Sequence, residues 1–67
     1  MKVVTYLYML GGAYKVGTSD NETMALVDAK RLGALEVFVL RGDVAPLVKE
    51  IGVKKVYNLV RIVKRYG

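Results

Sequence analysis

The chain has 67 residues, no cysteine, no histidine and a net charge of +5. This length allows one domain, residues 1–67, with a thin core, and the missing residue types exclude His/Cys zinc sites, cysteine catalysis and the common catalytic triads. The apolar runs are too short to cross a bilayer, so we expect a cytoplasmic protein that does not enter membranes. We also expect no cofactor. The scarcity of thermolabile side chains is typical of thermophiles.

The N-terminal residues predict a β-hairpin. Residues 3–10 are rich in β-branched and aromatic side chains, and they are apolar on both faces of the expected strand. Gly11 and Gly12 follow, and such a pair supplies the positive φ angles of a tight turn. A short second strand, 13–16, is expected to end at Gly17.

A helix is predicted after the hairpin. Ser19 and Glu22 have the spacing of a capping box, with Ser19 as the N-cap. Gly33 is the expected stop signal. The stripe expected to face the core consists of Ala25, Leu26, Ala29 and Leu32.

The middle of the chain predicts a buried strand and a short helix. Residues 35–40 are almost continuously apolar, as expected for a strand that is covered on both faces. Asp43 is a suitable N-cap for a helix over 44–51, in which Pro46 is tolerated because it lies in the first turn. Gly52 is expected to end this helix.

The last fifteen residues allow two interpretations. In the first, 53–57 is a strand, Asn58 is an N-cap, and a terminal helix buries Leu59, Ile62, Val63 and Tyr66 and ends at Gly67. In the second, one helix starts near residue 53 and buries Val56, Leu59, Val60 and Val63. We favour the first because it completes a right-handed β-α-β crossover.

Together these elements predict an α+β fold. It consists of a small mixed β-sheet, formed by the N-terminal hairpin plus one or two further strands, packed with two or three helices. The element order is ββαβα(β)α.

The charge of the chain is segregated. Residues 1–51 carry six basic and six acidic side chains, whereas 53–67 carry five basic ones and no acid. A solvated surface usually mixes both signs, so the segregation favours a polyanionic ligand. Tyrosines on the hairpin could stack on unpaired bases, which favours RNA over DNA. The expected nucleic-acid-binding residues are Lys54, Lys55, Arg61, Lys64 and Arg65, extended by Lys15, Tyr8 and Tyr14.

Two motifs resemble known nucleic-acid-related families. The stretch Tyr6-Leu7-Tyr8, followed by YKVGTSD at 14–20, resembles the start of a GIY-YIG nuclease domain. This resemblance implies that Tyr8 and Tyr14 are paired tyrosines and that Glu50 is a distant candidate metal ligand. Met24 stands where that family has an arginine, so the resemblance implies a non-catalytic relative.

A second resemblance begins at Asn21-Glu22-Thr23. Together with the stretches at 34–40 and 43–47, this segment is similar to archaeal kink-turn-binding ribosomal proteins. In that family an Asn-Glu pair at a helix start reads RNA. The resemblance implies a ribosome-associated RNA-binding protein.

We therefore expect a small basic protein that binds nucleic acid without catalysis. The first alternative is an assembly protein that forms a homo-oligomer, or a larger assembly, or docks on an acidic partner. The second alternative is a metal-dependent nuclease of the GIY-YIG type.

Overall fold

The computed structural model describes residues 3–66 and the side chains from Val3 to Lys64. The side chains of Arg65 and Tyr66, and Gly67 with the helix end expected there, lie outside the described residues. The α+β class is confirmed, although all strand pairs among these residues are antiparallel and the sheet is therefore not mixed. The elements are β1 (Val4–Leu10), β2 (Ala13–Ser19), α1 (Glu22–Leu32), β3 (Val37–Arg41), α2 (Ala45–Ile51) and α3 (Val53–Tyr66).

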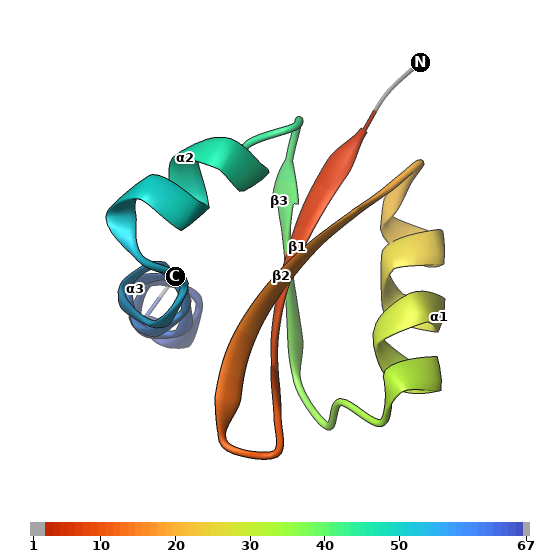
Figure 1. Cartoon of the computed structure of the whole chain (residues 1–67), viewed down its shortest axis with the longest axis horizontal. Helices are drawn as coiled ribbons and strands as arrows, with labels where there is room; N and C mark the ends of the chain where they lie inside the picture. The colour runs from red at the N-terminus through yellow and green to blue at the C-terminus, as the bar shows by residue number, and fades with distance from the viewer. Residues whose placement is uncertain (1–2, 67) are drawn as a thin grey trace.

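The sheet has the strand order β2-β1-β3, and a helix layer covers each of its faces (Figure 1). Helix α1 packs on one face, and α2 and α3 pack on the other. This sandwich explains why β1 is apolar on both sides, since successive strand residues point to opposite faces. The α1 face buries Tyr6, Tyr8, Ala25 and Ala29, and the α3 face buries Leu7, Phe38, Val48 and Tyr57.

The hairpin turn at Gly11 and Gly12 is confirmed, with φ angles of 57° and 80°. Strand β2 does not end at Gly17, however, but continues to Ser19. Gly17 is needed because the Tyr6 ring lies against it: a Cβ added there would lie 2.6 Å from Cζ of Tyr6. This glycine therefore makes room for an aromatic ring and does not end the strand.

The N-cap of α1 is Asn21, so the assignment of Ser19 was wrong. The Asn21 side chain accepts a hydrogen bond of 2.8 Å from the Met24 N–H. Ser19 still belongs to β2, and its hydroxyl donates to Asp28 at 3.3 Å. The predicted N-cap lies two residues too early because β2 continues to Ser19 and not only to residue 16.

The stripe of α1 that faces the sheet is narrower than predicted. Only Ala25 and Ala29 are buried, while Leu26 and Leu32 are 40% and 47% exposed. Small alanines let the helix approach the rings of Tyr6 and Tyr8 closely. The predicted stop at Gly33 is confirmed, because its left-handed conformation closes the helix.

Helix α2 begins at Ala45, with Val44 rather than Asp43 at the N-cap position. No side chain of its own segment caps it. The Val44 N–H instead donates to Oγ1 of Thr5 at 2.9 Å, and the Thr5 hydroxyl donates to the Gly42 carbonyl, also at 2.9 Å. A fully buried threonine of β1 therefore caps a helix that lies far along the chain.

Helix α3 starts at Val53, so the favoured strand over 53–57 was wrong and the alternative of one continuous helix is confirmed. The residues that pack on the sheet are Val53, Val56, Tyr57 and Val60, at the spacing i, i+3, i+4, i+7 of a helix face. The second predicted stripe is therefore right for Val56 and Val60, whereas no described member of the first stripe packs on the sheet. Leu59 and Val63, which both interpretations buried, are 55% and 65% exposed.

Candidate nucleic-acid interface

Helix α3 carries two basic side chains and an asparagine together on one flank. Because the helix is continuous, Lys54, Asn58 and Arg61 have the spacing i, i+4, i+7 and share one side of it. Lys64 lies four residues after Val60 and therefore continues the row that packs on the sheet. Lys54, Arg61 and Lys64 are exposed, and Asn58 is half-buried. We call Lys54, Asn58 and Arg61 the basic flank; Lys55 and Lys64 are also exposed but lie outside it.

Tyr57 holds α3 firmly on the sheet. Its side chain is 1% exposed, and its ring lies edge-on to those of Tyr14, with centroids 5.0 Å apart, and Phe38, at 5.1 Å. Its hydroxyl donates a short hydrogen bond of 2.6 Å to Glu36. Since edge-to-face aromatic pairs and charge-assisted hydrogen bonds are directional, the basic flank beside Tyr57 has a defined position relative to the sheet.

The structure brings Lys54 and Tyr14 together, two residues predicted to belong to one site. Nζ of Lys54 lies 5.9 Å from the centroid of the half-buried Tyr14 ring, within the range of a cation–π contact. Arg61 lies one turn beyond Tyr57. Burial and the hydrogen bond to Glu36 raise the pKa of Tyr57 to about 12, and the Arg61 charge opposes that rise.

Two other predicted residues lie elsewhere. Tyr8 is 8% exposed and packs beneath α1, on the opposite face of the sheet from Tyr14. Lys15 pairs with Tyr8 across the hairpin, so its exposed side chain also lies on the α1 face. The predicted set is therefore divided between two faces. Arg65 lies outside the described side chains.

The residues assigned by the two resemblances do not converge. Tyr8 and Tyr14 are not paired, and Glu50 is an exposed residue of α2. Among the described residues, no three His, Cys, Asp or Glu side chains lie close enough together to hold a metal ion. Asn21, which the kink-turn resemblance places on RNA, uses its side-chain oxygen to cap α1.

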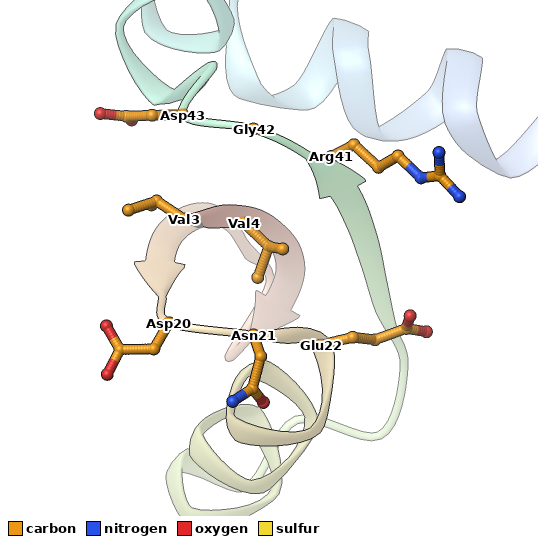
Figure 2. Close-up of a pocket in the computed structure, with 8 residues that line it drawn as sticks. All are labelled: Val3, Val4, Asp20, Asn21, Glu22, Arg41, Gly42 and Asp43. Carbon is orange, nitrogen blue, oxygen red and sulfur yellow. The ribbon is translucent and has the colours of Figure 1, made fainter. Parts of the chain in front are cut away.

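Three acidic residues line a different feature, an open hollow of about 830 Å³ where β1 begins and β2 and β3 end (Figure 2). They are Asp20, Glu22 and Asp43. The carboxylates of Asp20 and Asp43 point to one side, whereas Glu22 and Arg41 extend to the other. Charges of both signs thus border this hollow. The arrangement contrasts with α3, whose sequence contains no acid.

Part of the basic flank was missed by the sequence interpretation. Asn58 was assigned as a helix cap, but in the continuous helix it lies between Lys54 and Arg61. The spacing i, i+4, i+7 of these three residues was visible in the sequence. It places the three residues on one side only in a continuous helix, whereas the favoured interpretation has a strand over 53–57.

No family model, curated protein or solved structure matches this chain. Within residues 3–66, no helix is both long enough and apolar enough to span a bilayer. Fold and charge together define a small α+β domain with a three-stranded antiparallel sheet and a basic terminal helix.

Proposed function

We propose that this protein binds nucleic acid through the basic flank of α3, without catalysis. The observation that carries the proposal is the position of the charge. The net charge of +5 equals the five basic residues of 53–67, and on α3 the described cations Lys54, Lys55, Arg61 and Lys64 are all exposed.

The dimensions of the flank suit a phosphate backbone. From Lys54 to Arg61 the helix rises by about 10 Å. Duplex DNA carries one negative charge for roughly each 1.7 Å of its axis, so the flank faces several phosphates at once. Lysine and arginine side chains that neutralise phosphates release counterions, and this release provides affinity that weakens as salt is added.

Recognition in this proposal rests on phosphates rather than on stacked bases. Both faces of the sheet are covered by helices, and Tyr6 and Tyr8 are buried. Tyr14 is half-buried, with Lys54 above its ring. The fold therefore does not support the stacking argument for a preference for RNA, and we propose binding to single-stranded RNA and to duplex DNA.

Fluorescence anisotropy with a generic single-stranded RNA and a generic DNA duplex tests this proposal. We expect binding at about 50 mM salt that weakens steeply by about 200 mM, with a slope corresponding to three or four phosphate contacts. Three or four contacts match the described cations of α3. Absence of affinity for both nucleic acids at the lower salt concentration would refute the proposal.

A further inference from the structure

The side of α3 that faces away from the sheet is open to solvent. Val53, Tyr57 and Val60 mark the side that packs on the sheet, and successive helix residues are turned by about 100° from one another. Asn58 and Ile62 therefore lie on the opposite side, one turn apart. In the part of the chain that the structure describes, no other element covers this side (Figure 1).

Cations border Asn58 and Ile62 on both sides. Lys54 and Arg61 of the basic flank lie on one side of these two residues, and Lys55 lies on the other. All three cations are exposed. A complementary ligand therefore carries negative charge along two lines, with other groups between them. Duplex DNA has this form, because two phosphate backbones border its major groove, which is about 12 Å wide and admits an α-helix.

Asn58 is the polar residue between these cations. The side-chain hydrogen bonds among the described residues do not involve its amide. No buried side-chain nitrogen or oxygen among those residues lacks a partner, so the Asn58 amide reaches solvent with its donor and its acceptor unused. In the major groove only adenine presents an acceptor, N7, beside a donor, the N6 amino group, and an asparagine amide can bond to both. Asn58 therefore has the chemistry to read adenine.

Ile62 adds an apolar group to the same side of α3. Its side chain is 54% exposed, and at the spacing i, i+4 its Cβ lies about 6 Å from that of Asn58. The apolar group that base edges present in the major groove is the C5 methyl of thymine. An exposed isoleucine beside an unused amide therefore suits A·T base pairs, whose two bases offer the adenine donor and acceptor and the thymine methyl group.

We propose that α3 enters the major groove of duplex DNA and prefers A·T base pairs, with Asn58 bonding to adenine and Ile62 contacting the thymine methyl group. Lys54, Lys55 and Arg61 contact the phosphates on either side of the groove. The inference rests on the proposed function, because these cations supply the affinity that does not depend on sequence. It adds the groove, the base pair and the two residues that read it.

Fluorescence anisotropy with three duplexes of equal length tests the inference: alternating A·T, alternating G·C and alternating inosine·cytosine. Inosine lacks the N2 amino group of guanine, so an inosine·cytosine pair resembles A·T in the minor groove and G·C in the major groove. We expect the wild-type protein to bind the A·T duplex about tenfold more tightly than either of the others. An A·T duplex with 7-deazaadenine, which lacks N7, should lose most of this preference. Uracil in place of thymine, which lacks the methyl group, should lose a smaller part of it.

Two variants assign the preference to its residues. Asn58→Ala should bind the A·T and G·C duplexes about equally, and it should fold because alanine is the better helix former. Ile62→Ala should no longer distinguish thymine from uracil. Ile51→Ala is the matched control for Ile62→Ala, because Ile51 is 50% exposed but belongs to α2, and this variant should still distinguish the two bases.

Several results would overturn the inference while the proposed function stands. They are equal binding of the wild-type protein to all three duplexes, an A·T preference that Asn58→Ala retains, and binding to single-stranded RNA but to no duplex. Binding of inosine·cytosine as tight as that of A·T would also overturn it, because the preference would then arise in the minor groove. Absence of affinity for RNA and for every duplex would refute the proposed function itself.

Discussion

At the residue scale, Tyr57 links the α3 face of the sheet to the basic flank. Its ring contacts Tyr14 of β2 and Phe38 of β3, and its hydroxyl bonds to Glu36 just before β3. The sequence interpretation placed Tyr57 at the end of a strand and gave it no role. Tyr57 is buried because its helical spacing from Val53 and Val60 places all three on the side that packs on the sheet. This spacing predicts burial only if α3 is one continuous helix.

Tyr57 should make stability depend on pH in the alkaline range. Burial and the hydrogen bond to Glu36 raise its pKa from 10.0 to about 12 in the folded protein. A raised pKa means that this contribution is complete below the unfolded value and disappears as pH rises from about 10 to about 12. Denaturation of wild type and Tyr57→Phe should give free energies of unfolding whose difference shrinks across this range.

The comparison with Tyr57→Phe isolates one tyrosine from the other groups that titrate at alkaline pH. Burial also raises the pKa of Tyr6, with Asp28 adding to the rise, but Tyr6 is present in both proteins. A difference that stays constant from pH 10 to 12 would contradict the assigned role of the Tyr57 hydroxyl.

At the element scale, Thr5 shows why helix starts were predicted less well than element types. The chain offered Ser19 and Asp43 as local caps, and both assignments were wrong. Helix α2 begins beside Thr5, which lies 39 residues before Val44 in the sequence. A cap supplied across such a separation leaves no local pattern, whereas the glycine turn at Gly11 and Gly12 does.

The Thr5 hydroxyl should contribute measurably to folding. Thr5→Val keeps the shape of the side chain but leaves the Val44 N–H and the Gly42 carbonyl without this partner. We expect a loss of about 1–3 kcal/mol in the free energy of unfolding, measured by chemical denaturation. Thr5→Ser, which keeps the hydroxyl, should recover most of the loss, and equal destabilisation by both variants would exclude the capping role.

Helix α3 was the element that the sequence left ambiguous. Its β-branched residues favour a strand locally, but the apolar spacing of Val53, Val56 and Val60 suits a helix that packs on the sheet. Tertiary packing decided between them. In the continuous helix, the buried stripe differs from both predicted ones, and Leu59, Ile62 and Val63 are exposed. The helix also places Asn58 between Lys54 and Arg61 on the basic flank.

At the scale of the whole molecule, the charge segregation was readable from the sequence but its geometry was not. The order of charged residues along the sequence already places the net charge in residues 53–67. Which cations share a surface depends on the sheet: Lys54 meets Tyr14 on the α3 face, while Lys15 lies on the α1 face. We therefore propose that nucleic-acid binding depends on where the cations lie on the surface and not on the total net charge.

The most direct test compares two double variants with the same net charge. Lys54→Gln/Arg61→Gln removes two cations from the basic flank, and Lys30→Gln/Lys49→Gln removes two exposed cations from α1 and α2. The measurement is the affinity for single-stranded RNA as a function of salt, after circular dichroism has shown that both variants are folded. The flank variant should bind more weakly, with a salt slope shallower by about 1.4, because two phosphate contacts are lost. The control variant should stay close to wild type; equal weakening by both variants would contradict the claim.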